Sequence, residues 1–447
     1  MVNRRGLARR IVSTAWPAVL EMMLYMTIGF VDVAMVGRLG PGPLAAVSLG
    51  AEIFFSLLMI LAALGMGATV LAAQAAGAGQ SQRVNHIAGQ TLLLAVSLGL
   101  LAGIPCYVNI PLITGLFPVE PDVYQMALNY LQVTMLITPF ALCLYMGNGV
   151  FRGIGRTRVP LGMALISNLV NIIGDYVLIF GKWGFPALGA QGAAVATTAA
   201  HLTGFLVLII VMVCGRYGIK IRVRDVFVPH LYTIKSILNL GLPTAVEDLL
   251  RGGSNLISTY FLTSLGTIAF AAHQISLTVE SVSYMPGYGF AIAATSLVGQ
   301  SIGARNTKEA WASAWGGLAF AAVIMGTASI IFFTLPGYVA FLFTNDRELV
   351  SVASLCIRIA ALSQLPIAFE MVLAGALRGA GDTRTPMIVS VIGIWLIRIP
   401  GIWLIIDVWK LGLIAIWWLF VVDWVFRSLV VLVMFLRGRW AVREPVL

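Results

Sequence analysis

Charged residues are scarce in this sequence: Asp, Glu, Lys and Arg make up 10% of its 447 residues, against about a quarter in soluble globular proteins. Hydrophobic residues make up 60%, and the mean hydropathy is +0.95. A chain of this composition cannot cover its surface with polar side chains, which excludes a soluble domain and intrinsic disorder. We therefore expect an integral membrane protein that crosses the bilayer many times.

Residues that build disulfide frameworks, metal centres and nucleotide sites are equally rare. The 4 cysteines form no CxxC pair and the 4 histidines form no HExxH motif, so neither a disulfide scaffold nor a metal centre is indicated. No GxxxxGK[ST] loop occurs, which excludes ATP binding of the Walker type. No nucleophile–base pair stands out for catalysis. The sequence therefore predicts a protein that is not an enzyme and carries no cofactor.

Long apolar runs fill most of the chain. A spanning helix needs about 20 mainly apolar residues, and helices are expected because backbone groups in lipid must bond within their own segment. The fold class is therefore all-α, with twelve transmembrane helices. They are predicted at 11–37, 46–76, 86–112, 122–148, 159–181, 187–214, 233–264, 269–299, 309–334, 348–376, 386–406 and 411–436.

Basic residues are distributed unequally between the two sides of these spans. The loops on the side opposite the N-terminus hold only Arg38, Lys182, Arg347 and Lys410. Within the spans lie Arg251, Arg358, Arg398 and Arg427. All the other Lys and Arg residues fall on the side of the N-terminus, so both termini are predicted in the cytoplasm and the protein in the inner (cytoplasmic) membrane. This asymmetry explains the net charge of +10 without a nucleic-acid partner.

The two halves of the sequence align without gaps at an offset of 226 residues. Glu21 matches Glu247, and the run Gly149-Val-Phe-Arg-Gly-Ile-Gly-Arg-Thr-Arg-Val-Pro160 matches Gly375-Ala-Leu-Arg-Gly-Ala-Gly-Asp-Thr-Arg-Thr-Pro386. Each half has an even number of spans, so both enter the membrane from the same side. The repeat predicts an N-terminal lobe at 1–221 and a C-terminal lobe at 222–447, as in two-lobed transporters.

At this point the sequence resembles the multidrug and toxic compound extrusion (MATE) family. The resemblance covers essentially the whole chain and is carried by the 6+6 layout, the paired Arg-Gly-x-Gly loops at 152 and 378, Ala271-Ala-His-Gln274, and Phe30-Val-Asp32-Val-Ala-Met-Val-Gly37-Arg-Leu-Gly40. It implies two six-helix bundles in a V shape. It also implies antiport of organic, mostly cationic compounds against H⁺ or Na⁺.

The resemblance also implies a cation site in the first lobe. The matching positions here are Asp32, Asn148, Asn171, Asp175 and Thr197. The NorM-like branch of the family carries two further acids in the second lobe, and Arg251 and Ile367 stand at their places here. These departures put a second-lobe cation site in doubt and favour the DinF-like branch.

Read from the residues alone, Asp32 and Asp175 lie at similar depths, five to six residues from the outer ends of their spans. No basic residue lies within a first-lobe span, so neither acid has an intramembrane partner there. An unpaired carboxyl in a dry site can take up a proton, and two carboxylates with amide oxygens could equally bind Na⁺. The alternative is a pair of hydrogen-bonded structural aspartates in a wet cavity.

Acids of the second lobe have arginines at helical spacing. Glu247 with Arg251 and Asp423 with Arg427 are each four residues apart, which predicts structural ion pairs. Glu370 has Arg358 in its own span and Arg398 in the next as candidate partners. The candidates for contact with substrate are Glu21, Met22, Met26, Glu247 and Glu370.

Pro17 lies inside the first span and Pro243 at the matching place in the seventh. A proline removes one helical hydrogen bond, so both helices are expected to kink or break there. In the family, bending of the first span is linked to cation binding, which makes Pro17 a candidate hinge.

The sequence therefore predicts a secondary active antiporter that works as a monomer in the lipid bilayer. It would export small-molecule drugs or toxins in exchange for H⁺ or Na⁺ by alternating access. The alternative is a flippase for lipid-linked sugar precursors of the same superfamily, whose cavity should be more basic. The residues decide neither the physiological substrate nor the coupling ion.

Overall fold

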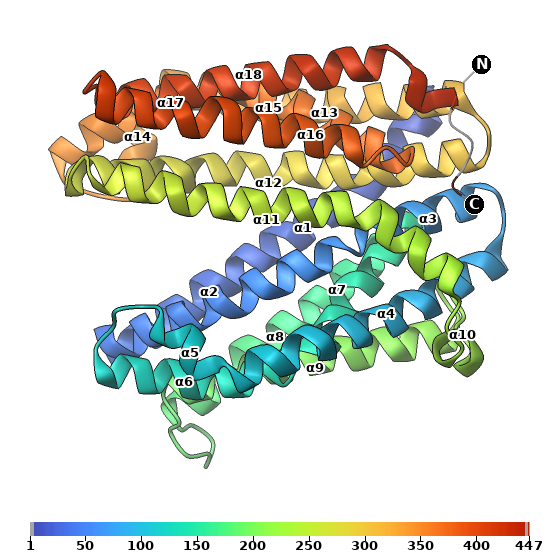
Figure 1. Ribbon diagram of the computed structural model, residues 1–447, viewed down its shortest axis with the longest axis horizontal. Helices are drawn as coiled ribbons and strands as arrows, with labels where there is room; N and C mark the ends of the chain where they lie inside the picture. The colour runs from blue at the N-terminus through green and yellow to red at the C-terminus, as the bar shows by residue number, and fades with distance from the viewer. Residues whose placement is uncertain (1–3, 443–445, 447) are drawn as a thin grey trace. The chain divides into compact units, whose positions relative to one another are not determined.

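The computed structural model describes residues 4–442 and 446, and all regular structure in this part of the chain is helical (Figure 1). The described helices group into twelve long segments at the predicted places, which agrees with the predicted twelve-helix membrane fold. The first six spans are α1 (Arg4–Val36), α2 with α3 (Pro41–Ala63 and Met66–Gly77), α4 (Ser81–Val108), α6 with α7 (Pro121–Met135 and Thr138–Gly153), α8 (Arg158–Phe180) and α9 (Ala190–Cys214).

The second six repeat this order. They are α11 (Leu231–Thr263), α12 (Thr267–Gly303), α13 (Thr307–Thr334), α15 (Arg347–Gly379), the continuous run Arg384–Val408 and α18 (Leu413–Leu436). The run Arg384–Val408 consists of α16 (Arg384–Ile392), η2 (Gly393–Arg398), α17 (Ile399–Trp403) and η3 (Leu404–Val408). Short connecting helices are η1 (Gly37–Leu39), α5 (Ile110–Gly115), α10 (Val223–Phe227), α14 (Pro336–Phe341) and η4 (Arg439–Val442).

Two of the twelve segments are not apolar enough to be recognised as membrane-spanning helices from their composition. Among the described residues, nine helices are long and apolar enough to cross a membrane, and the pair α6 and α7 joins them as one span bent by 57°. The remaining two, α11 and α12, are the helices with the most polar side chains per span, including Glu247, Arg251 and Glu280. Such side chains are costly in lipid, so we expect these helices to turn their polar faces toward protein or water.

Proline lies at two of the interrupted spans but does not interrupt α1 or α11. The bend between α6 and α7 comes directly before Pro139, which has no N–H for the preceding turn. Pro400 lies between the two wider, π-helical segments η2 and η3. In contrast, α1 continues through Pro17 and α11 through Pro243 as unbroken helices.

The chain folds into two compact units whose boundaries differ from the sequence boundary at 221/222. Unit 1 consists of residues 1–19 and 246–447, and unit 2 of residues 20–245. The beginning of α1 belongs to unit 1 because Ile11 and Ala15 pack into its core. The segment 215–230 between α9 and α11 stays with unit 2, because the buried Gln90 side chain of α4 binds its backbone at Asp225, Val228 and His230.

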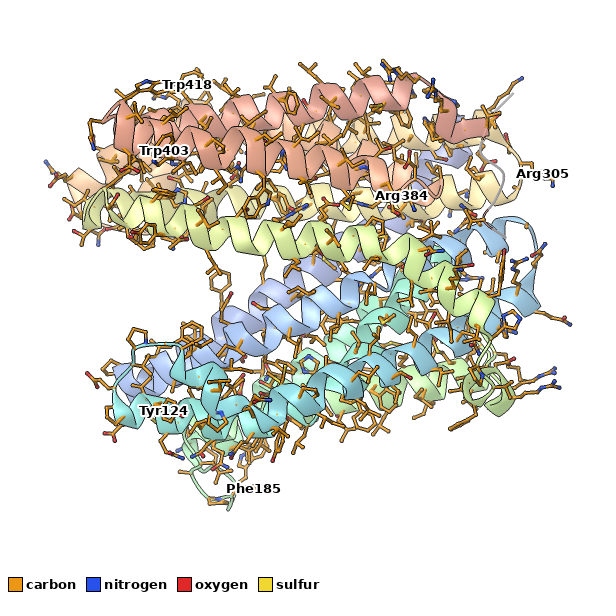
Figure 2. All side chains as sticks on the ribbon, viewed as in Figure 1. Tyr124, Phe185, Arg305, Arg384, Trp403 and Trp418 are labelled. Carbon is orange, nitrogen blue, oxygen red and sulfur yellow. The ribbon has the colours of Figure 1, made fainter. Side chains whose placement is uncertain are left out.

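Each unit is organised around its most buried helices. In unit 1, α15 packs against α12, α13 and α18. In unit 2, α8 packs along α9, and α7 packs against α3 and α4 (Figure 1). The labelled side chains of unit 1 separate by type along its helices, with Arg305 and Arg384 toward one end and the exposed Trp403 and Trp418 toward the other (Figure 2). An excess of basic residues on one side and tryptophans at the membrane interfaces are typical of membrane proteins.

The first glycine of each Arg-Gly-x-Gly loop lies where two helix backbones come so close that a side chain would not fit. A Cβ built at Gly153, the last residue of α7, would lie 2.3 Å from the carbonyl oxygen of Thr69 in α3. Its repeat counterpart Gly379 would meet the carbonyl oxygen of Thr295 at the same 2.3 Å. The two halves thus conserve a helix contact that only glycine permits.

We expect Gly153→Ala to destabilise the protein by about 1–3 kcal/mol, the usual range for overpacking against atoms that cannot rotate away. Gly162→Ala is the matched control, because a Cβ there meets nothing within 4 Å and alanine favours the α8 helix by about 0.5–1 kcal/mol. The measurement is thermal unfolding of the purified variants in detergent. Equal melting temperatures for the two variants would contradict the close approach.

Candidate cation and substrate sites

Unit 2 contains a cavity of about 400 Å³. Its walls come from α1, α2, α7, α8 and α9, so helices far apart in the sequence contribute to one site. The polar side chains that line it are Tyr25, Asp32, Ser48, Glu52, Tyr145, Asn148, Ser167, Asn168, Asn171, Thr197 and His201. The predicted cation residues Asp32, Asn148, Asn171 and Thr197 are therefore brought together.

Asp175, the fifth of these residues, is buried directly behind the cavity wall. Its side chain has no solvent exposure, and its carboxyl group lies close to that of Asp32. The hydroxyl of Tyr130, on α6, lies close to Thr197 and to both acids. Asn171 and Asp175 are one helical turn apart on α8, which directs both side chains toward the same side.

The oxygen atoms of this group have unused hydrogen-bonding capacity. Buried atoms without a hydrogen-bond partner include Asp32 Oδ1, Asn148 Oδ1, Asn171 Oδ1, both carboxylate oxygens of Asp175, and Thr197 Oγ1. Buried polar groups normally have partners, because burial without one costs about 1–3 kcal/mol each. A cluster of unpartnered oxygens from five residues therefore points to something that binds between them.

Aromatic rings form another part of the cavity wall. Tyr25 stacks on Tyr145 with ring centroids 5.7 Å apart, and His201 lies against Phe54 and Phe55. The Nδ1 atom of His201 is 2.9 Å from the carbonyl oxygen of Thr197. An apolar and aromatic pocket with a few polar groups is typical of sites for small organic molecules.

Three residues predicted to contact substrate in the first lobe do not line this cavity. Glu21 is fully buried and accepts two hydrogen bonds from Arg152, at 2.5 and 3.2 Å, so its carboxylate is already engaged. Met22 and Met26 are also absent from the residues that line the cavity. The face of α1 that lines it carries Tyr25, Ile28, Gly29, Asp32 and Val33 instead, because the packing of the helix rather than its methionines decides which face is inward.

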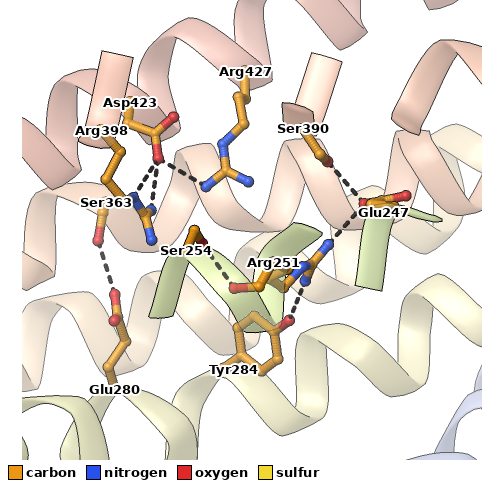
Figure 3. A network of polar contacts seen from close by, with 10 residues as sticks. All are labelled: Glu247, Arg251, Ser254, Glu280, Tyr284, Ser363, Ser390, Arg398, Asp423 and Arg427. Carbon is orange, nitrogen blue, oxygen red and sulfur yellow. Dashed lines mark hydrogen bonds and ion pairs between the residues drawn. The ribbon is translucent and has the colours of Figure 1, made fainter. Parts of the chain in front are cut away.

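Glu247 of the second lobe is likewise enclosed by partners (Figure 3). Arg251 donates to its Oε1 at 2.7 Å, and so does the Ser390 hydroxyl at 2.8 Å. Arg378 donates to its Oε2 at 2.7 Å. Glu247 therefore does not face a substrate as a free carboxylate, and it has one more arginine than the helical spacing predicts.

Asp423 is the second carboxylate held by two arginines (Figure 3). Arg427 lies 3.1 Å from it, one helical turn away, and Arg398 lies 2.6 Å from it. Because Arg398 binds Asp423, and Arg358 donates to the carbonyl oxygen of Phe333, neither serves as the expected partner of the buried Glu370.

The pair of Glu21 with Arg152 is the contact that reasoning from single helices missed. Its counterpart in the second half is Glu247 with Arg378, and both pairs span 131 residues. All four residues belong to the internal repeat. The repeat places an acid and an arginine at the same two positions in each half, and this recurrence could have predicted the long-range ion pair.

Comparison with known proteins bears on the same residues. The pattern that describes the MatE family matches the chain twice, over residues 17–177 and 243–404. The chain belongs to the MATE family of membrane transporters. The two matches begin 226 residues apart, which supports the internal repeat. The protein is thus a multi-pass membrane transporter rather than an enzyme.

Relatives of this MATE protein align over nearly the whole chain. The probable multidrug resistance protein NorM of Thermotoga maritima is 33% identical, over 97% of this chain and 93% of its own. The multidrug resistance protein MdtK of Yersinia pseudotuberculosis is 27% identical, over 98% and 96%. The DinF-like or NorM-like branch stays a prediction.

Among solved structures, the Vibrio cholerae MATE transporter VcmN superposes with a TM-score of 0.90 at 19% identity, covering 99% of this chain and 100% of its own. A multidrug resistance MATE transporter in an outward-facing conformation gives 0.87 at 22%, covering 97% and 95%. At these identities the superpositions establish the fold.

Proposed function

We propose that this chain is a secondary active exporter of small organic molecules, drugs or toxins among them, driven by inward movement of H⁺ or Na⁺. The family membership supports transport, and the names of the NorM and MdtK relatives support multidrug efflux. Alternating access between the two sides of the membrane is the mechanism that a two-lobed repeat favours. The protein acts as a monomer in the cytoplasmic membrane, with both termini in the cytoplasm.

The observation that carries this proposal is the group of buried, unpartnered oxygens at Asp32, Asn148, Asn171, Asp175 and Thr197. A Na⁺ ion is a hard cation that takes oxygen ligands, and this group supplies only such ligands. A proton would serve equally, because two adjacent carboxyl groups in a dry site favour binding one proton between them. In both cases the cation removes the repulsion between Asp32 and Asp175.

The cavity beside these acids suits the proposed substrates. Asp32 and Glu52 are acidic side chains in a wall of aromatic and aliphatic side chains, so an organic cation can place its charge near a carboxylate and its body against the rings. Because the coupling ion and the substrate both depend on Asp32, binding of one weakens binding of the other, which is the requirement for exchange.

The unit 2 cavity does not favour a flippase for lipid-linked sugar precursors. Its substrate carries phosphate groups, for which arginine or lysine is the usual partner. No arginine or lysine lines the unit 2 cavity within the described part of the chain.

The proposal is tested in proteoliposomes that contain the purified protein and ethidium as the transported cation. A proton gradient and a sodium gradient are imposed separately, each with the other ion held equal on both sides. Ethidium movement against its gradient under one of the two conditions supports the proposal and identifies the ion. No movement under either condition would reject cation-coupled export.

Pro17 remains the candidate hinge in this proposal. It lies two residues before the point at which α1 passes from unit 1 to unit 2, between Val19 and Leu20. The carbonyl of Ser13 lacks its usual helical donor there, and the Ser13 hydroxyl donates instead to the carbonyl of Arg10, at 3.0 Å. A missing hydrogen bond at this place lowers the cost of bending α1.

We expect Pro17→Ala to restore that bond and to slow ethidium turnover about tenfold, while ethidium binding changes by less than about twofold. A tenfold change in rate corresponds to about 1.4 kcal/mol, which is the size of one backbone hydrogen bond. Transport in proteoliposomes and equilibrium binding provide the two measurements. A variant with wild-type turnover would show that Pro17 only packs.

A further inference from the structure

A second cavity, of about 460 Å³, lies within unit 1 and has no role in the mechanism proposed above. It is enclosed by α11, α12, η2 and α18. Its charged lining differs from that of the first cavity, because it consists of three arginines, Arg251, Arg398 and Arg427, and one acid, Glu280.

The two cavities occupy matching places in the internal repeat. Adding 226 to residue numbers in the first cavity leads to residues that line the second: Tyr25 becomes Arg251, and His201 becomes Arg427. The same shift replaces Asp32 by Ser258 and Asp175 by Gly401. The second copy of the cavity has thus lost both coupling acids and has gained guanidinium groups.

The acids that balance these arginines lie mostly behind the cavity wall. Asp423 and Glu247 are fully buried, do not line the cavity and are each shared by two arginines. Asp248 and Glu370 lie near Arg251 but also do not line it. A molecule inside therefore meets guanidinium groups first, with Glu280, held by the Ser363 hydroxyl at 3.2 Å, as the single carboxylate (Figure 3).

The arginines retain donors for a ligand. A guanidinium has five N–H groups, yet Arg427, which is only 2% exposed, makes one hydrogen bond to Asp423 and leaves its buried Nε without a partner. Arg251 also leaves Nε unpartnered, and its second contact, to the Tyr284 hydroxyl, is long at 3.5 Å. The Arg251 side chain is 34% exposed, so its remaining N–H groups match the oxygens of a carboxylate or sulfonate.

Aromatic rings hold the guanidinium groups and provide an apolar wall. The Arg427 guanidinium lies 3.7 Å from the centroid of the Trp424 ring, and that of Arg398 lies 4.8 Å from the Phe420 ring. Tyr284 and His273 complete the aromatic lining. The cavity therefore combines fixed positive charge with surfaces that an aromatic body can cover.

We propose that the second-lobe cavity is a binding site for organic anions, with an aromatic or aliphatic body and a carboxylate or sulfonate group. This inference rests on the proposed export function, to which it adds a substrate class. Transported molecules then include anionic and zwitterionic compounds in addition to the cations that the first cavity suits.

The test measures binding of radiolabelled 2-naphthoate and of its neutral analogue 2-naphthamide to the purified full-length protein by equilibrium dialysis. Arg251→Gln is the chosen variant, because Arg378 and Ser390 still hold Glu247 when Arg251 is removed. We expect about tenfold weaker binding of 2-naphthoate, the loss that accompanies one hydrogen bond to a charged group. Binding of 2-naphthamide should not change.

Glu280→Gln should act in the opposite direction. It removes the one negative charge of the lining and keeps an oxygen for the Ser363 hydroxyl, so 2-naphthoate binding should become severalfold tighter. Tighter binding of 2-naphthoate cannot come from a misfolded protein, so this result would not depend on whether the Arg251→Gln variant folds.

Two results would overturn the inference: equal affinities of the wild-type protein for the anion and the amide, or 2-naphthoate binding that neither substitution changes. Ethidium transport by the first-lobe variant Asp32→Asn tests the proposed cation coupling separately. That variant should bind 2-naphthoate like the wild type.

Discussion

Replacing Asp32 by asparagine should abolish gradient-driven export of ethidium, with rates falling to those of liposomes without protein. The amide has the size of the carboxyl group and keeps one oxygen in the cavity, so the fold and the cavity should persist. It can neither take up a proton nor contribute a negative charge to a Na⁺ site. Asp175 then has no acidic partner, and cation binding no longer relieves a repulsion.

The measurement compares transport with binding in the same preparation. Ethidium binding should weaken only severalfold, because Tyr25, Tyr145 and Glu52 still line the cavity. Asp122→Asn is the matched control: it makes the same substitution at an exposed position in the first turn of α6 and should leave transport intact. Wild-type export by Asp32→Asn would refute the assignment of the coupling site.

Arg152→Ala should cause the largest loss of stability, about 3–5 kcal/mol. Glu21 has no exposed surface, and Arg152 forms an ion pair with it through two hydrogen bonds. Removal of one partner of a buried pair leaves an uncompensated charge in low dielectric, which is the costly case. The free energy is measured by denaturant unfolding of the purified protein in detergent.

The repeat supplies a comparison for this prediction. Arg251→Ala should cost much less, because Arg378 continues to bind Glu247. Arg156→Ala, four residues beyond Arg152 and exposed, serves as a control for the loss of a positive charge. Glu21→Gln combined with Arg152→Ala should recover a large part of the loss, since no charge is then left alone. A double variant as unstable as the sum of its singles would argue against the pair.

Membrane insertion made much of this fold predictable. Lipid requires long apolar helices, so the apolar runs of the sequence located the spans to within several residues, although α11 and α12 are too polar to qualify as membrane spans by composition alone. The repeat followed from the constant offset that joins, for example, Pro17 with Pro243. The family resemblance supplied Asp32, Asn148, Asn171, Asp175 and Thr197, and four of these line one cavity in the structure.

Side-chain partners across helices were less accessible from the sequence. The spacing of four residues predicts Arg251 for Glu247 and Arg427 for Asp423, because a single helix sets that geometry. The second arginine of each acid, Arg378 or Arg398, comes from another helix. Whether this second arginine reaches the acid depends on how the helices pack, which the spacing of residues within one helix does not show.

The sequence by itself determined the membrane class, the number of helices, the repeat and the identity of the acids that lie in the membrane, since each depends on composition or on local spacing. Only the tertiary structure decided which face of α1 lines the cavity, that Glu21 is bound by Arg152, and that the second cavity is lined by arginines. These features arise where helices separated by a hundred residues or more meet. Their contacts are set by the packing of whole helices and therefore leave no pattern within any one of them.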